Sequence, residues 1–165
     1  MRVLGIDPGY AIVGYGVLDY EKNKFFPVEY GAVTTQVHTD FQERLKEVYN
    51  SVDDIIKRTK PDALSIEKLF FTTNQKTVIQ VAQARGVILL AASMNGIPVY
   101  EYTPLQIKQS VTGYGKAIKT QVQEMTKRIL NLPAMPKPDD AADAIAIALC
   151  HARSSTSLLS QVTRN

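Results

Sequence analysis

The chain has 165 residues, of which 45% are hydrophobic and 21% are charged, with a formal net charge of +3 and a single cysteine. This length suits one domain, and one cysteine excludes both an internal disulfide and a cysteine-rich zinc site. The N-terminus lacks a signal-peptide pattern and no stretch of about 18 uninterrupted apolar residues occurs, so we expect a cytoplasmic protein.

The first 60 residues change from strand periodicity to helix periodicity. Three segments rich in β-branched and aromatic residues, separated by turn-forming or polar residues, predict antiparallel strands. These strands cover residues 3–6, 12–18 and 25–35. From residue 39 to about 59, apolar residues recur at helical spacing, and Thr39 followed by Gln42 gives a capping-box pattern. We therefore expect an amphipathic helix that begins at a threonine cap.

The rest of the chain alternates strands and helices. We expect a fourth strand at 63–67, a helix over about 75–94 and a short fifth strand at 97–100. The remaining helical segments are near residues 104–111, 117–130 and 138–153. This order predicts an α/β protein with a mixed five-stranded sheet, three antiparallel strands followed by two parallel ones, and helices on both faces. We expect residues 1–154 to form one domain and 155–165 to form a polar, flexible tail.

Carboxylates recur at the ends of these predicted elements. Asp7 ends the first strand and Glu67 ends the fourth, and neighbouring strands lie about 4.8 Å apart, so the two side chains meet if these strands pair. Asp139, Asp140 and Asp143 fall on one arc of about 100° on the last helix. Acids at a helix start are common because the helix dipole favours them, which explains the first two of these by itself. Asp143 lies deeper, among apolar residues of a helix that we expect to be buried.

Acids gathered in a partly buried cleft would repel one another by about 4 kcal/mol per pair at 4 Å and an effective dielectric near 20. A bound cation resolves this conflict. Oxygen-only ligands favour Mg²⁺ or Mn²⁺ over zinc. We expect two Mg²⁺ ions per site, with Mn²⁺ as a substitute, because two ions about 3.5 to 4 Å apart activate a water and stabilise the leaving oxygen in phosphodiester hydrolysis.

Four segments carry a shared pattern: Gly5-Ile6-Asp7-Pro8-Gly9, Ile66-Glu67, Gln83-Ala84-Arg85-Gly86 and Asp140-Ala141-Ala142-Asp143-Ala144. They resemble the motifs of the RuvC family of Holliday junction resolvases, nearly end to end. The resemblance implies a ribonuclease H-like fold and a structure-selective endonuclease that resolves four-way DNA junctions by symmetric, metal-dependent hydrolysis during recombination and repair. Matched residue by residue, it also implies four catalytic metal ligands and leaves Asp139 as a bystander. These ligands are Asp7, Glu67, Asp140 and Asp143.

Positive charge gathers in residues 101–130, where five basic residues outnumber two acidic ones. Lys116 and Lys119 fall at the start of a predicted helix, where the dipole disfavours cations, so a bound phosphate would reverse an unfavourable interaction. The stretch fails the P-loop pattern because the required Ser or Thr is missing. A solvated basic helix face is the ordinary alternative. The resemblance implies that Lys108 and Lys119 contact the DNA backbone, and we add Lys116 and Arg85 as candidate DNA-binding residues.

Two aromatic residues, Phe70 and Phe71, follow Glu67 at the active-site end of the predicted sheet. One of them can cap the core, whereas an exposed one can stack on bases, which contributes about 1 to 3 kcal/mol per base. The resemblance supports Phe70 in the stacking role. The helix over 75–94 is apolar nearly all round, which indicates burial on two sides. The resemblance implies a homodimer that acts on two symmetric strands, with the branch-migration proteins RuvA and RuvB as further partners.

Other functions are compatible with parts of this pattern. An RNA-processing nuclease of the same fold would share the opening motif and the acids, and it is the enzymatic alternative. A non-catalytic nucleic-acid-binding module is the second alternative, and the full set of four acids counts against it. An actin-like ATPase is disfavoured because that architecture duplicates the fold and this chain has room for one copy. His38 and His151 are assigned structural positions, the second because a cation suits a helix C-terminus.

Overall fold

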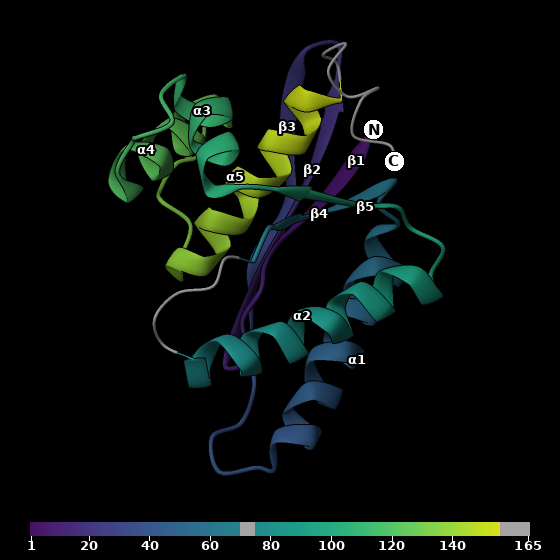
Figure 1. The fold of residues 1–165 in the computed structure, drawn as a ribbon. Helices are drawn as coiled ribbons and strands as arrows, with labels where there is room; N and C mark the ends of the chain where they lie inside the picture. The colour runs from purple at the N-terminus through teal and green to yellow at the C-terminus, as the bar shows by residue number, and fades with distance from the viewer. Residues whose placement is uncertain (70–74, 156–165) are drawn as a thin grey trace.

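The computed structural model describes residues 1–69 and 75–155, which form a mixed sheet with helices on both faces (Figure 1). The strands are β1 (Arg2–Asp7), β2 (Ile12–Glu21), β3 (Lys24–Thr34), β4 (Ala63–Glu67) and β5 (Val99–Tyr102). The helices of this described part are α1 (Phe41–Thr59), α2 (Gln75–Met94), α3 (Pro104–Thr112), α4 (Lys119–Ile129) and α5 (Asp139–Ser154). The sheet order is β3-β2-β1-β4-β5, antiparallel from β3 to β1 and parallel from β1 to β5. The expected fold class is confirmed.

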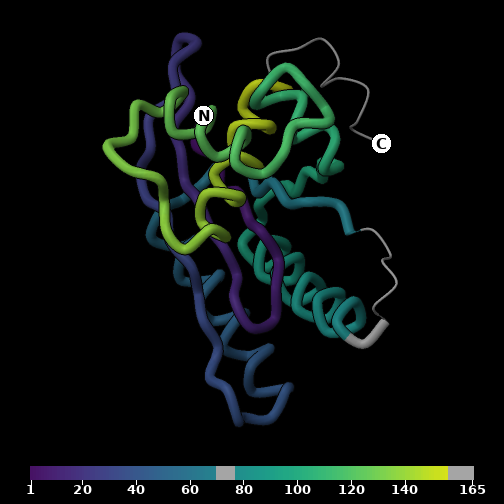
Figure 2. Tube along the Cα trace, turned by 90° about the vertical axis from the view of Figure 1, so that its left-hand side faces the viewer, coloured from purple at the N-terminus to yellow at the C-terminus, as the bar shows by residue number. Residues whose placement is uncertain are grey.

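Two hydrophobic cores, one on each face of the sheet, hold the helices in place. α1 and α2 pack over Leu4 and Ile6 of β1, whereas α3, α4 and α5 pack on the opposite face, where Val3 lies. Figures 1 and 2 show this division from two sides. Successive strand residues point to opposite faces, so a central strand covered on both faces is apolar along its whole length. This explains the continuous apolar run that precedes Asp7.

α5 lies close against β1 and β2 because the strand residues beneath it are glycines. A Cβ atom added at Gly14 would lie 2.0 Å from the carbonyl oxygen of Asp140, and one added at Gly5 would lie 2.1 Å from that of Ala144. Strand glycines commonly mark such close approaches of another backbone. The helix backbone therefore rests directly on the strand backbone, and this contact brings the acids of α5 over the end of β1.

The start of α1 differs from the sequence expectation. The helix begins at Phe41 with Asp40 as its cap residue, and no side chain makes a capping hydrogen bond there. Thr39 instead donates its hydroxyl to the carbonyl of Gln36, one turn earlier. The expected threonine capping box is therefore wrong, because a local turn uses the hydroxyl group.

Three strands, β2, β3 and β5, also have boundaries that differ from the expected ones. β5 lies two residues later than expected, because its pairing with β4 runs on until Tyr102 stands opposite Glu67. β2 and β3 extend through most of the polar stretch between them and turn at Lys22 and Asn23, both of which have positive φ. Of the expected tail, only Ser155 belongs to the described residues.

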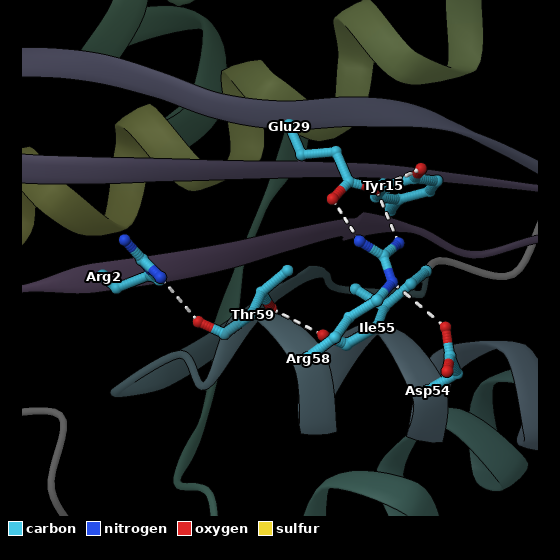
Figure 3. A network of polar contacts seen from close by, with 7 residues as sticks. All are labelled: Arg2, Tyr15, Glu29, Asp54, Ile55, Arg58 and Thr59. Atoms are coloured by element: carbon cyan, nitrogen blue, oxygen red, sulfur yellow. Dashed lines mark hydrogen bonds and ion pairs between the residues drawn. The ribbon is translucent and has the colours of Figure 1, made fainter.

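Charged residues tie α1 to the edge of the sheet (Figure 3). Arg58 of α1 donates two hydrogen bonds to the Glu29 carboxylate on β3, one of them 2.6 Å long, and Tyr15 of β2 donates to the same carboxylate at 2.8 Å. Arg58 also donates to Asp54 at 3.0 Å. The hydrogen bonds from Arg58 hold the pKa of Glu29 below its usual range, because they stabilise the charged carboxylate.

β3 is the edge strand on this side of the sheet, and its pairing is irregular. The register against β2 shifts just before Leu18, which stands opposite Pro27. Around this point Phe26, Val28 and Tyr30 have exposed side chains.

Candidate active site

The ends of β1 and β4 bring two carboxylates together. Ile6 pairs with Ile66 in the parallel ladder, so Asp7 and Glu67 follow at the same edge of the sheet, as the sequence predicts. Both side chains line a cleft of about 190 Å³, together with Asp143 of α5. Lysine side chains and apolar side chains complete its lining. These residues are Pro104, Ile107, Lys108, Lys119, Val122, Ala146 and Ile147.

The acids lie close enough to change one another's ionisation. Burial raises the pKa of Asp7 to about 7, and the charges of Asp143, Glu67 and Asp140 act in the same direction, whereas Lys119 opposes the rise. Burial, followed by the charge of Asp143, also raises the pKa of Glu67. The four acids matched to the family motifs therefore converge electrostatically, although Asp140 does not line the cleft itself. Their catalytic role stays a prediction.

Lys119 lies among these acids. Its Nζ atom is 2.8 Å from an oxygen of Asp143 and 3.6 Å from an oxygen of Asp139. The hydrogen bond to Asp143 raises the pKa of the lysine. Lys119 is the first residue of α4, where the helix dipole disfavours a cation. Carboxylates of α5, instead of the expected phosphate, compensate its charge. Asp139, the expected bystander, has this lysine as its ion-pair partner.

The donor set suits a hard divalent cation, although the side chains do not close around one. Within residues 1–69 and 75–155, no three carboxylate, imidazole or thiol groups converge tightly enough to hold an ion as they stand. The donors are nevertheless carboxylate oxygens, which Mg²⁺ and Mn²⁺ prefer. Burial and then the repulsion among the acids raise the pKa of Asp7, and a bound cation would relieve the repulsion. These residues fit the metal in chemistry, while Asp143 is paired with Lys119.

The other candidate DNA-binding residues lie in different surroundings. Lys108 lines the cleft, and its charge partly offsets the rise in the pKa of Glu67. Lys116 is exposed to solvent. Arg85 is mostly buried and pairs with Glu101 at 2.5 Å, which leaves little of its guanidinium accessible to DNA. Phe70 lies outside the described residues.

His151 is buried and occupies a different environment from the one expected. Its Nδ1 atom lies 2.7 Å from the hydroxyl of Tyr102, and its ring packs against Tyr100 with centroids 4.3 Å apart. Burial lowers the pKa of His151 to about 4, so the ring is neutral at pH 7. The argument from a cation at a helix C-terminus is therefore wrong, while the structural position is confirmed. Cys150 is a buried core residue, as expected.

Sequence reasoning missed residues that shape the cleft without carrying charge. Gly14 admits α5 to the sheet, and a glycine inside a predicted strand was an available signal for a close approach. α3, which supplies Pro104 and Ile107, begins with a true capping box formed by Thr103 and Gln106. The sequence Thr-Pro-x-Gln is a recognisable helix start and could have located this wall of the cleft.

The fold and the site together define the ribonuclease H-like class of nucleases, with carboxylates at the ends of two adjacent central strands and on the helix packed across them. The chain belongs to the RuvC family, described as crossover junction endodeoxyribonuclease RuvC, which matches residues 3–151. A crossover junction endodeoxyribonuclease RuvC from Ruminiclostridium cellulolyticum is 56% identical over 154 residues, covering 93% of each chain.

Two solved structures of Thermus thermophilus RuvC share the fold. One is 37% identical, with a TM-score of 0.88, and the match covers 94% of this chain and 95% of that one. The other, in complex with a Holliday junction substrate, is 36% identical, with a TM-score of 0.89 and 94% of each chain covered.

Proposed function

We propose that this protein is a structure-selective endonuclease that resolves four-way DNA junctions by hydrolysing phosphodiester bonds at the acidic cleft. The observation that carries the proposal is the partly buried Asp7, whose pKa is raised to about 7 by burial and by three further acids beside lysine side chains. Membership of the RuvC family, and the likeness to a relative bound to a Holliday junction, support the choice of substrate.

The four acids would hold Mg²⁺ at this site, with Mn²⁺ as a substitute. Two bound ions would activate a water molecule and stabilise the leaving oxygen. Asp7 and Glu67 are suited to a fixed geometry because each ends a strand of the sheet. Asp140 and Asp143 are held by the contact of α5 with the glycines of β1 and β2. The chain thus supplies carboxylates from three separate elements to one edge of the sheet.

We assign the binding of the DNA backbone to lysines around the cleft. Lys108 and Lys119 line it, and Lys116 lies exposed just before α4. Phosphate contacts position a protein on DNA without reading sequence, which suits an enzyme that selects its substrate by shape. We also propose that Phe70 contacts bases and that Arg85 contacts DNA. Arg85 would first have to break its ion pair with Glu101.

We further propose a homodimer through α2. Large apolar side chains are exposed on one stripe of this helix at Ile79, Leu90 and Met94. Within the described residues, the segment Thr77–Met94 also has the length and apolarity of a membrane span, with 22% of it buried. A second copy of the chain would cover such a stripe and set two clefts about a two-fold axis, which matches the symmetry of a four-way junction.

We place the protein in the cytoplasm. Because it belongs to the RuvC family, we also propose RuvA and RuvB as further partners.

Cleavage of three substrates side by side tests the proposal. We expect the protein with Mg²⁺ to cut a synthetic four-way junction and to leave duplex DNA and structured RNA of the same length largely intact. Asp7→Asn should abolish the cutting while junction binding persists, because it removes a ligand charge and leaves the lysines in place. Preferential cleavage of RNA would support an RNA-processing nuclease instead, and binding without any cleavage would support a non-catalytic module.

A further inference from the structure

Lys119 occupies the acidic cleft in the manner of a bound cation. Its ammonium lies 2.8 Å from one oxygen of Asp143, and it lines the same cleft as Asp7 and Glu67. Its charge opposes the rise in the pKa of Asp7, which burial and the neighbouring acids cause. In the protein without metal, this ammonium therefore supplies part of the positive charge that the carboxylates need.

A divalent cation and this ammonium compete for Asp143. Mg²⁺ lies about 2.0 to 2.1 Å from its ligand oxygens, so an ion bound to the paired oxygen would lie within about 5 Å of the lysine nitrogen. Two cations at that distance repel each other, and a partly buried cleft screens the repulsion less than open solvent does. Occupation by one therefore disfavours occupation by the other.

The lysine is the cation that can leave. Its side chain is 54% exposed and starts at the N-terminal residue of α4, where the helix dipole disfavours a positive charge. Asp139 lies 3.6 Å from the same nitrogen and does not line the cleft. A short movement of the ammonium toward Asp139 would vacate Asp143 while keeping one ion pair.

We propose that Lys119 is an internal counter-ion of the acidic cleft, which a divalent cation must displace from Asp143 in order to bind. The proposal rests on the proposed function, since it requires the cleft to take a divalent cation. Displacement frees the ammonium for a new anionic partner. Lys119 thus has two partners in turn: the Asp143 carboxylate before metal binds, and a phosphate of the DNA backbone once it has bound.

Titration of the full-length protein with Mn²⁺ alone, without DNA, by isothermal calorimetry tests this competition. Lys119→Met removes the charge while keeping a long side chain, and it should lower the Kd for Mn²⁺ about tenfold, which corresponds to about 1.4 kcal/mol. Lys119→Arg keeps the charge and should bind Mn²⁺ no more tightly than the unaltered protein. Lys108→Met is the matched control, because Lys108 lines the same cleft and no ion pair holds it within the described residues. It should change the Kd far less.

Each outcome separates the competition from other effects. A Kd for Lys119→Met equal to or weaker than that of the unaltered protein overturns the proposal and leaves the proposed function standing. Equal tightening in Lys119→Met and Lys108→Met also overturns it, because the effect would then follow from net charge alone. No Mn²⁺ binding by any form overturns the metal site of the proposed function as well. Lys119→Gln gives the same comparison if circular dichroism shows that the methionine variant is unfolded.

Discussion

Replacing Gly14 by alanine should push the start of α5 off the sheet. The new Cβ atom would lie 2.0 Å from the carbonyl oxygen of Asp140 and 2.4 Å from its carbonyl carbon. Contacts below 3.0 Å force something to shift, and here both neighbours are backbone atoms that cannot rotate away. The oxygen has to withdraw by about 1.4 Å to reach an ordinary contact of 3.4 Å. Asp140 and Asp143 would move with it, away from Asp7.

The size of this movement sets the expected effects. A misplacement of about 1 Å at a catalytic group can reduce the rate about 100-fold, so we expect at least that loss in junction cleavage. Overpacking of a tight contact costs about 1 to 3 kcal/mol, and the free energy of unfolding should fall by that amount. Single-turnover cleavage with Mg²⁺ measures the first effect, and urea unfolding measures the second.

Gly31→Ala is the matched control for this experiment. Gly31 lies on β3 of the same sheet, and the three atoms nearest to its added Cβ atom would be the hydroxyl oxygen and two ring carbons of Tyr15, at 3.0 to 3.2 Å. That ring can turn, so the rate of cleavage should change little. A Gly14→Ala protein that cleaves at the original rate, with α5 unmoved in its crystal structure, would refute the reasoning about direct backbone contact.

Three further predictions concern charge and assembly. In EDTA, the folded protein holds a proton on Asp7 up to about pH 7, whereas the ordinary pKa of this carboxyl is 3.8. The free energy of unfolding should therefore fall as pH rises between these two values, by at most about 1.4 kcal/mol per pH unit. Urea unfolding of Asp7→Asn should show that most of this dependence on pH is gone. In the presence of a divalent cation, Lys119→Ala should reduce the slope of log binding constant against log salt for a junction by about 1, because one phosphate contact is lost. Leu90→Glu should yield a folded monomer by sedimentation, because this side chain is 53% exposed within one chain, and the monomer should nick junction strands one at a time.

Each of these predictions has a contrary result. An unchanged pH slope in Asp7→Asn would show that other groups carry the proton uptake, with Glu67 the first to examine because its pKa is also raised. An unchanged salt slope in Lys119→Ala would refute the phosphate contact. A Leu90→Glu protein that stays dimeric, or a monomer that still cuts both strands in concert, would contradict the proposed interface.

Patterns along the chain predicted the fold class and the convergence of the acids. Strand ends are visible in sequence because apolar runs stop at turn residues, and Asp7 and Glu67 both stand at such ends. Parallel pairing of β1 with β4 then brings the two together without further information. The helical arc that carries Asp140 and Asp143 likewise follows from periodicity. These features depend on local spacing, which a sequence records directly.

The partners of individual side chains could not be predicted in the same way. Lys119 meets Asp143 because α4 and α5 pack at one particular distance, and that distance depends on side chains that are far apart in sequence. His151 looks like a helix-end cation in sequence, and only the packing of Tyr100 and Tyr102 around it shows that it is buried. The local turn in which Thr39 donates its hydroxyl to Gln36, so that α1 begins after Asp40, likewise could not be predicted from the capping-box motif.

The irregular edge at β3 bears on how the protein behaves at high concentration. An edge strand offers unpaired backbone groups on which a strand from another molecule can build, and exposed Phe26 and Tyr30 would favour such growth. Pro27 has no N–H to donate, and the shift of register beside Leu18 bends the ladder at the same point. An incoming strand would therefore meet an interruption three residues after the start of β3 at Lys24. The exposed side chains of this edge favour association, but its backbone pairs poorly with another strand. We therefore expect little edge-to-edge aggregation of the folded chain.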